Sequence, residues 1–233
     1  MSLLEVRDIH AYYGDSYVLQ GVSLKVEKGA VVAVLGRNGV GKTTLIRSIM
    51  RLTPVRRGNI LFHDQDITYA DTFRIARLGI SLIPQGRRLF SSLTTEENMI
   101  IAARSQGSSS WSIDRTLAMF PRLKERLQTR AARLSGGEQQ MLAFGRALVR
   151  NGELLLMDEP TEGLAPLVVQ QIGATIKELK EEGLSMVLVE QNVPFALKHA
   201  DYVYIMSKGK IVYESPPKAL EEDSQSRLRY LGV

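Results

Sequence analysis

Cysteine is absent from the sequence, and histidine is scarce. Without cysteine the chain can form no disulfide bond, no Cys-ligated metal site and no thiol nucleophile. The three histidines, His10, His63 and His199, are scattered along the chain, and we interpret each as a surface or packed residue. The composition therefore argues against thiol chemistry and against a histidine-based metalloenzyme.

Long apolar runs are missing as well. The longest one, at residues 30–35, is far shorter than the roughly 20 residues that a membrane-spanning helix needs. The first residues show no basic segment followed by an apolar run, so we expect no signal peptide. If the protein serves a membrane, we expect it to dock onto the membrane rather than to cross it.

What the chain does contain is typical of a globular protein with a sizeable core. It has 233 residues, of which 44% are hydrophobic and 24% are charged, enough for one large domain or two small ones. Its formal net charge of +5 permits contact with nucleotides, nucleic acid or anionic lipid. An ordinary basic enzyme surface explains the same charge.

Continuous apolar runs mark three segments that suit parallel strands buried on both faces, residues 30–35, 154–157 and 185–189. Residues 80–83 are a candidate for a fourth such strand. Helical patterns alternate with them, at residues 43–51, 139–150 and 168–182. This alternation predicts an α/β fold with a parallel sheet at its core.

The N-terminal part and the middle of the chain differ from this core. Residues 3–9, 18–26 and 59–62 read as short strands joined by turns, which predicts an antiparallel sheet. The middle lacks strand patterns and predicts helices at 95–104 and 113–123, with a flexible loop at 107–110. We predict one domain, residues 1–233, with the core and the antiparallel sheet in residues 1–93 and 151–233, and an inserted helical subdomain from about 94 to 150.

Residues 36–43, Gly-Arg-Asn-Gly-Val-Gly-Lys-Thr, fit the pattern Gly-x-x-x-x-Gly-Lys-Thr of a phosphate-binding loop. A predicted strand precedes them and a predicted helix follows, which is the context that this motif requires. The glycines let backbone N–H groups curl around phosphate oxygens, and the helix N-terminus adds its positive dipole end. We expect Lys42 to reach the β- and γ-phosphates and the Thr43 hydroxyl to bind Mg²⁺.

An acidic pair, Asp158 and Glu159, ends the apolar run at 154–157. A buried strand would deliver Asp158 beside the phosphate loop, where it can hold Mg²⁺ directly or through water. Glu159 would then polarise the attacking water as a general base. Taken alone, two solvated acids at a strand end are the simpler explanation, but the phosphate loop favours the functional one.

The hexapeptide at residues 134–139, Leu-Ser-Gly-Gly-Glu-Gln, narrows the class of nucleotide-binding protein. Ser135 and Glu138 match a capping box, which predicts a helix that starts here. Gly136 and Gly137 leave the first N–H groups of that helix bare and so make a second anion site. Together with the two motifs above, this hexapeptide resembles the ABC transporter ATPase family, and the resemblance covers essentially the whole chain.

The resemblance implies how these residues work together. Two such domains form a head-to-tail dimer that sandwiches two ATP molecules, and Ser135 and Gly137 of one domain bind the γ-phosphate held by the phosphate loop of the other. Tyr13 stacks on adenine, with Tyr12 as an alternative, and Gln85 touches Mg²⁺. Residues 87–90 contact the membrane subunit.

These inferences give a set of expected site residues. The expected nucleotide-binding residues are Tyr13, Gly36, Asn38, Gly39, Gly41, Lys42, Thr43, Thr44, Gln85, Ser135, Gly136 and Gly137. The expected metal ligands are Thr43, Gln85 and Asp158, and the expected catalytic residues are Glu159, Lys42 and Gln191.

Two positions depart from the usual pattern of the family. Gln191 stands where the family usually has a switch histidine, and a glutamine can donate a hydrogen bond but cannot carry a proton as an imidazolium does. Ala165 stands where an aspartate usually communicates across the dimer. Gly-Leu-Ala-Pro at 163–166, Val-Glu-Gln-Asn at 189–192 and Tyr-Leu-Gly-Val at 230–233 resemble the LivF type within the family.

The LivF resemblance implies an importer of branched-chain or related hydrophobic amino acids. The chain would work as a peripheral subunit on the cytoplasmic side of the inner membrane, with transmembrane permease subunits and, indirectly, a solute-binding protein. Its partner ATPase would be of the LivG type, or a second copy of itself. Gln85 stands where LivF-like chains often carry glutamate, whereas importers of urea or short-chain amides carry glutamine there, so this solute class stays open.

Other classes fit the sequence less well. A soluble ABC ATPase acting on nucleic acid or ribosomes usually has a long coiled-coil insertion or two ATPase halves, and the sequence shows neither, so we expect no nucleic-acid partner. A GTPase would carry the motif Asn-Lys-x-Asp, which is absent. A scaffold that binds ATP without hydrolysing it would not need Glu159.

Overall fold

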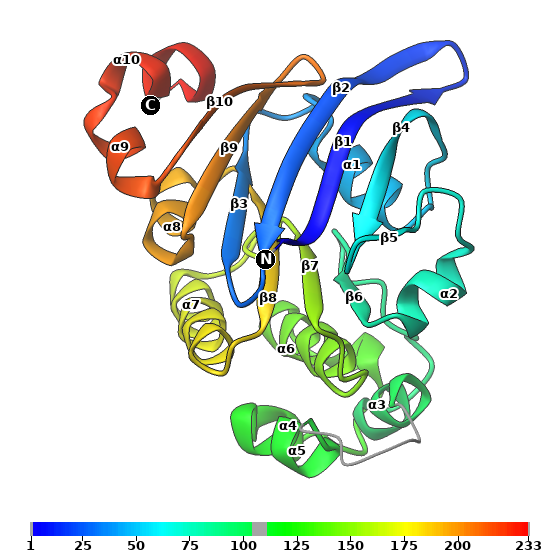
Figure 1. Ribbon diagram of the computed structural model, residues 1–233. Helices are drawn as coiled ribbons and strands as arrows, with labels where there is room; N and C mark the ends of the chain where they lie inside the picture. The colour runs from blue at the N-terminus through cyan, green and yellow to red at the C-terminus, as the bar shows by residue number, and fades with distance from the viewer. Residues whose placement is uncertain (1, 104–110, 233) are drawn as a thin grey trace.

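Helix α1 (Lys42–Ile49) packs between two β-sheets, and this sandwich organises the fold (Figure 1). The structure is a computed structural model that describes residues 2–103 and 111–232, so the loop predicted at 107–110 lies outside the described residues. Apolar side chains of α1, among them Leu45, Ile46 and Ile49, join both sheets in one buried cluster. Burial of this helix is what fixes the phosphate loop, because the loop leads directly into it.

The central sheet has six strands in the order β10-β9-β3-β8-β7-β6. All neighbours are parallel except β10, which is antiparallel to β9. The strands are β3 (Val31–Leu35), β6 (Ile80–Ile83), β7 (Leu154–Asp158), β8 (Ser185–Glu190), β9 (Tyr202–Ser207) and β10 (Lys210–Ser215). Every residue of β3, β7 and β8 is buried, which explains why these strands were visible as continuous apolar runs.

The second sheet is antiparallel, as predicted, and has the order β2-β1-β4-β5. Its strands are β1 (Ser2–Tyr13), β2 (Ser16–Glu27), β4 (Val55–Phe62) and β5 (Gln65–Asp66). The strands run further than the sequence predicted, and β1 continues to Tyr13 through register shifts next to Asp8, whose φ is +46°. Gly58 of β4 lies against β1 at this point. A Cβ at Gly58 would lie 2.2 Å from the Asp8 carbonyl oxygen, so the close approach of the two strands requires glycine here.

The remaining helices are α2 (Thr72–Arg77), α3 (Thr95–Ala102), α4 (Ile113–Met119), α5 (Pro121–Lys124), η1 (Ala131–Arg133), α6 (Gly136–Leu148), α7 (Pro166–Glu181), α8 (Val193–His199), α9 (Pro217–Glu222), α10 (Ser224–Ser226) and η2 (Arg227–Leu231). Helix α2 lies on the α1 side of the central sheet, where Ile75 joins the same buried cluster, whereas α6, α7, α8 and α9 pack on the opposite face. The helix predicted at 113–123 is wrong as a single element: it breaks at Phe120, because Pro121 cannot continue the hydrogen bonding of α4. That residues 94–150 form a subdomain of their own stays a prediction.

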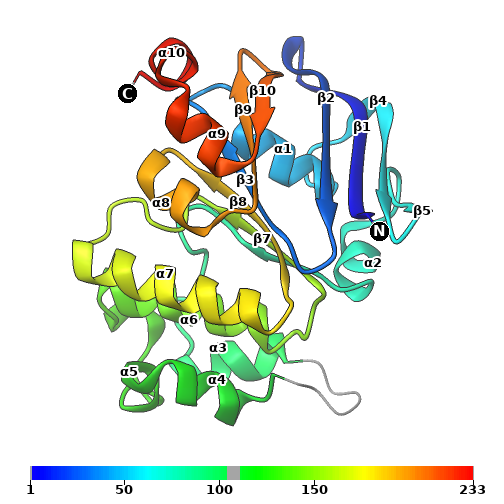
Figure 2. The same cartoon turned by 60° about the vertical axis from the view of Figure 1, so that its left-hand side comes forward.

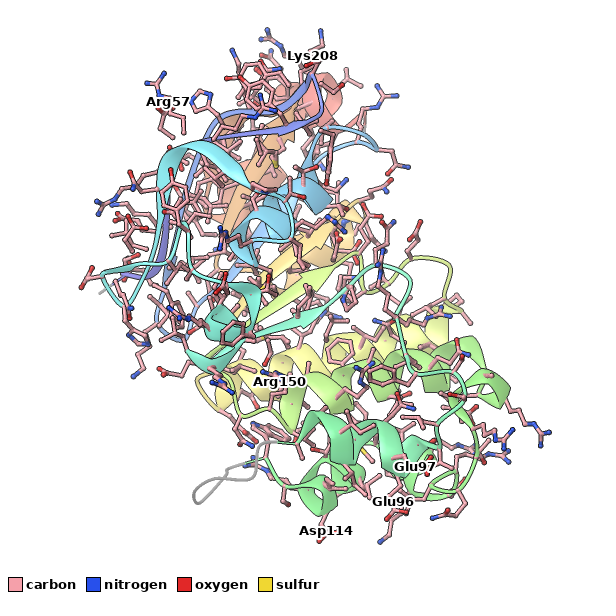
Figure 3. The ribbon with its side chains drawn as sticks, turned by 90° about the vertical axis from the view of Figure 1, so that its right-hand side faces the viewer. Arg57, Glu96, Glu97, Asp114, Arg150 and Lys208 are labelled. Carbon is pink, nitrogen blue, oxygen red and sulfur yellow. The ribbon has the colours of Figure 1, made fainter. Side chains whose placement is uncertain are left out.

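Two further clusters complete the core. Helices α6 and α7 lie side by side on the second face of the central sheet, with α3, α4 and α5 stacked against α6 (Figure 2). Helices α8 and α9 close the β3 and β9 region in a smaller cluster. Arg57 and Lys208 lie at the end of the molecule near the antiparallel sheet, and Glu96, Glu97 and Asp114 lie at the opposite end (Figure 3). Among the described residues, no helix is long and apolar enough to cross a bilayer.

Parallel pairing sets the place of the site. The strands β3, β8, β7 and β6 are neighbours and run in the same direction, so their carboxyl ends share one edge of the sheet. The phosphate loop follows β3, the acidic pair ends β7, Gln191 follows β8 and Gln85 follows β6. Open α/β sheets bind ligands at this edge.

The packing of α7 can be tested with two adjacent residues. Ile176 is fully buried against the central sheet, whereas the Lys177 side chain is 73% exposed. We expect Ile176→Ala to lower the free energy of unfolding by about 2–5 kcal/mol, because it leaves a cavity. Lys177→Ala should change it by no more than about 0.5 kcal/mol. Urea denaturation of both variants measures the difference, and equal effects would contradict this packing.

Candidate nucleotide-binding site

The phosphate loop folds around the ammonium group of Lys42. This side chain is only 4% exposed, and its Nζ donates hydrogen bonds to the carbonyl oxygens of Gly36 (2.9 Å) and Arg37 (3.0 Å). Gly41, the residue before α1, has a φ of +110°, a conformation that other residues rarely adopt. A Cβ at Gly36 would lie 2.5 Å from the Met206 carbonyl oxygen, so this position also requires glycine.

Glu159 is the residue on which the other polar groups converge. Its carboxylate forms an ion pair with Lys42 at 3.1 Å and accepts hydrogen bonds from the side-chain amides of Gln191 (3.1 Å) and Gln85 (3.3 Å). Glu159 is 8% exposed, and its φ of +50° is unusual for a residue with a side chain. Strained backbone of this kind concentrates at functional sites.

Asp158 lies beside the start of α1. Its Oδ1 accepts a hydrogen bond of 3.1 Å from the Thr43 hydroxyl, and the residue is 3% exposed. Burial raises the pKa of Asp158 to about 6, and the neighbouring charge of Glu159 acts in the same direction. The Thr43 hydrogen bond and the charge of Lys42 oppose this rise in pKa.

The three expected metal ligands lie around one small hollow. Thr43, Gln85 and Asp158 line a cavity of about 170 Å³. They offer a hydroxyl, an amide oxygen and a carboxylate, which are oxygen donors of the kind that Mg²⁺ prefers. Among the residues described, no group of three or more His, Cys, Asp or Glu residues is arranged so that it could hold a metal ion by itself. This donor set fits Mg²⁺, which usually takes one or two carboxylates and completes its coordination with substrate phosphates and water.

A larger open cavity of about 340 Å³ lies in front of the phosphate loop. It is lined by Val18, Asn38, Gly39, Gly41, Lys42, Thr43, Thr44, Gln85, Glu159 and Glu162. The structure thus brings the residues expected from the phosphate loop together with Gln85 and Glu159. Gly36 lines a neighbouring cavity of about 400 Å³ with Asn38 and Gln191.

Sequence reasoning missed two residues of this lining. Val18 is an apolar residue near the start of β2 and carries no chemical pattern of its own. Glu162 follows the acidic pair by three residues and accepts a hydrogen bond of 2.9 Å from the Gln85 amide. An acid so close to Glu159 in a loop could have been identified from the sequence as a contact of the site.

The amide of Gln191 connects the phosphate loop with the acidic pair. Besides its bonds to Glu159, its Nε2 donates to Oδ1 of Asn38 in the phosphate loop. Gln191 therefore bridges Asn38 of the phosphate loop and Glu159 at the end of β7.

The two adjacent tyrosines differ in accessibility. Tyr12 stacks on Tyr17, with ring centroids 4.5 Å apart, and the guanidinium of Arg56 lies 4.4 Å from the Tyr12 centroid. Tyr13 is 46% exposed, and its hydroxyl lies 3.0 Å from Oγ1 of Thr53, just beyond α1. Of the two rings, Tyr13 is the accessible one, although neither is among the described residues that line the phosphate cavity.

The hexapeptide at 134–139 lies elsewhere. Its capping box is formed as predicted: the Ser135 side chain accepts from the Glu138 N–H at 3.3 Å, and the Glu138 carboxylate accepts from the Ser135 N–H at 2.7 Å. A Cβ at Gly137 would lie 2.8 Å from a methyl group of Val168, so α7 also requires this glycine. Ser135, Gly136 and Gly137 do not line the phosphate cavity among the residues described.

The fold and the site define a nucleotide-binding protein of the phosphate-loop class. The sequence model of the family described as "ABC transporter" matches residues 19–162. The chain belongs to the ABC transporter family, as one of its ATP-binding ATPase subunits.

Several relatives are similar over nearly the whole chain. The high-affinity branched-chain amino acid transport ATP-binding protein BraG of Pseudomonas aeruginosa is 41% identical over 232 residues, covering 99% of this chain and 100% of that protein. The probable branched-chain amino acid transport protein LivF of Archaeoglobus fulgidus is 35% identical and covers 99% of each. A solved ATP-binding cassette of an ABC transporter in its ADP conformation has a TM-score of 0.86 at 28% identity, covering both chains fully.

The raised pKa of Asp158 makes stability depend on pH in the absence of nucleotide and metal. Its folded pKa of about 6 lies above the ordinary value of 3.8, so the folded state binds more protons between these values and stability falls as the pH rises through them. We expect Asp158→Asn to stabilise the protein at pH 7.5, on the order of 2 kcal/mol.

This gain should disappear toward pH 4, where Asp158 is protonated in the folded protein. Thermal unfolding in EDTA at a series of pH values measures it, and Lys177→Ala serves as a control with no pH-dependent effect. A gain that stays constant from pH 4 to 7.5 would show that the Asp158 carboxyl has an ordinary pKa.

Proposed function

We propose that the chain energises an importer of branched-chain or related hydrophobic amino acids by hydrolysing ATP on the cytoplasmic side of the inner membrane. The observation that carries the ATPase chemistry is the convergence of Lys42, Asp158 and Glu159 at one edge of the sheet. The names of the relatives BraG and LivF support the solute class. Urea or a short-chain amide is the alternative solute, because of the glutamine at Gln85.

In this proposal each group in the cleft has one role. The phosphate loop and Lys42 hold the β- and γ-phosphates, and Tyr13 stacks on adenine. Thr43, Asp158 and Gln85 would hold Mg²⁺, which supplies positive charge at the phosphates. Glu159 polarises the attacking water and Gln191 senses the γ-phosphate.

The proposed active unit is a head-to-tail dimer. The exposed Ser135 and the bare N–H groups of Gly136 and Gly137 form an anion site that the cavity of its own chain does not use. A second ATPase places that site against the γ-phosphate, and hydrolysis then reopens the dimer. A LivG-type protein of Archaeoglobus fulgidus is 29% identical to this chain over its whole length. We therefore propose a LivG-type ATPase as the partner in the dimer, ahead of a second copy of this chain.

The permease subunits are proposed to dock beside α3 and α6. A groove of about 310 Å³ there combines four arginines with apolar side chains. Its lining includes Arg87, Arg88, Arg146, Arg150, Phe90 and Ile101. Arg150 lies at the seam between the sheet and the helices (Figure 3). Arg87 also donates to Gln139 of α6 at 3.2 Å, so the groove is joined to the helix that carries the second anion site.

Substitution of Glu159 separates the binding of ATP from its hydrolysis. In the free protein Glu159 forms an ion pair with Lys42, so it competes with phosphate for this ammonium group. We expect Glu159→Gln to slow ATP turnover of the assembled transporter by about 100-fold or more, while ATP affinity is kept or rises. Phosphate release and binding of a fluorescent ATP analogue measure the two effects.

Lys42→Ala is the contrasting variant, since it should weaken ATP binding itself. Lys177→Ala, on an exposed face of α7, is the matched lysine control and should change neither quantity. Normal turnover in Glu159→Gln would refute the proposed general base, and normal affinity in Lys42→Ala would refute the proposed phosphate site.

The transport role is tested by what binds the chain. The Glu159→Gln variant, expressed in its native cell and solubilised gently with Mg-ATP, should co-purify with integral membrane permeases and a second ATPase, identified by mass spectrometry. The reconstituted wild-type complex should then take up labelled leucine rather than urea. Recovery of ribosomes or DNA-repair proteins without a permease would contradict the transport role but not the ATPase chemistry.

A further inference from the structure

Glu190, the last residue of β8, is a buried acid without a basic partner. It is 2% exposed, and no lysine or arginine nitrogen lies within 4.0 Å of its carboxylate among the described residues. A buried charge of this kind is costly unless hydrogen bonds compensate for it. Burial raises the pKa of Glu190, and the hydrogen bonds described next oppose this rise.

Every acceptor site of this carboxylate is used. Oε1 accepts from the backbone N–H of Thr161 at 3.1 Å and from its hydroxyl at 2.7 Å. Oε2 accepts from the backbone N–H groups of Gln191 at 3.1 Å and Asn192 at 3.2 Å. A carboxylate offers about four acceptor sites, and hydrogen bonds to it are stronger than hydrogen bonds between neutral groups. The Glu190 carboxylate therefore links two loops, the one at Thr161 and the one at Gln191 and Asn192, through a complete set of hydrogen bonds.

The two loops carry the reacting groups of the proposed site. Thr161 lies two residues after Glu159, whose φ of +50° must be held by its surroundings. Gln191 follows Glu190 directly, and its amide bonds to both carboxylate oxygens of Glu159. Asn192 caps α8 by accepting from the Phe195 N–H at 3.1 Å, so the second loop is anchored to a helix.

We infer that Glu190 is a positioning residue. It holds the turn after Glu159 and the loop of Gln191 in fixed positions relative to each other, so that the proposed general base and the proposed phosphate sensor stay in contact. Glu190 acts only through these residues, and it lines none of the cavities of the nucleotide site among the described residues. The inference rests on the proposed roles of Glu159 and Gln191.

Glu190→Gln tests this link between the two loops and leaves the size and shape of the side chain nearly unchanged. A glutamine has one acceptor oxygen, so its NH₂ group must face either the Thr161 donors or the backbone N–H groups of Gln191 and Asn192. We expect kcat for ATP in the purified transporter to fall about tenfold or more, with KM for ATP within about twofold, because the phosphate loop is untouched.

Thr161→Val keeps Glu190 and removes only the hydroxyl that bonds to it. It should lower kcat in the same way, and the double variant should lose no more than the more severe single variant, because both changes break one link. Additive losses would show that the two residues act separately. Thr161→Val also keeps the inference testable if Glu190→Gln fails to fold.

Asp201→Asn is the matched control for loss of a structural carboxylate. Asp201 accepts from the Val31 N–H at 2.9 Å and from Lys180 at 2.6 Å, at the opposite end of the central sheet. It should lower the melting temperature and leave kcat unchanged. If Glu190→Gln behaves like this control, the residue is only structural and the inference is wrong.

Glu159→Gln, measured in parallel, separates the two proposals. Loss of turnover in Glu159→Gln with normal turnover in Glu190→Gln would remove the positioning role and leave the proposed function intact. Normal turnover in Glu159→Gln would instead refute the proposed base, whatever Glu190→Gln does.

Discussion

The buried ammonium group of Lys42 is the interaction on which the site depends. A charge that is only 4% exposed must be compensated, and here two carbonyl oxygens of the phosphate loop and the carboxylate of Glu159 do so. The same contacts close the loop around the position of the phosphates and hold Glu159 near it. Arriving phosphate oxygens would replace the carboxylate as the partner of Lys42, which would connect nucleotide binding to release of Glu159, the proposed general base.

The parallel sheet makes this arrangement possible. Strands β3, β7 and β8 are buried throughout, so polar groups can appear only where the strands end. Asp158 is the last residue of β7 and Glu190 the last of β8, and both lie at one edge because the strands are parallel neighbours. Burial at this edge raises the pKa of both acids, because a carboxylate removed from water is harder to ionise.

The proposed second anion site lies away from the phosphate loop of its own chain. The capped N-terminus of α6 does not line the cavity of that loop among the described residues. Packing against Val168 fixes Gly137, and Arg87 connects this helix terminus to the loop that holds Gln85. A nucleotide clamped between two copies of these surfaces would therefore couple the cleft to the groove beside α3 and α6.

The sequence alone determined four strands of the central sheet (β3, β6, β7 and β8), most of β1, β2 and β4, the phosphate loop, the acidic pair and the capping box, because each depends on residues close together in the chain: apolar runs, glycines before Lys42, and Ser135 three residues before Glu138. It did not determine the break at Phe120, the extension of β1 to Tyr13, or β5, β9, β10 and the C-terminal helices, whose patterns are short. Only the tertiary structure decided that Gln191 bonds to Glu159, that Glu162 contacts Gln85 and that Glu190 joins two loops. These contacts link residues 29 to 77 positions apart, and they follow from the order of strands in the sheet, which no local pattern specifies.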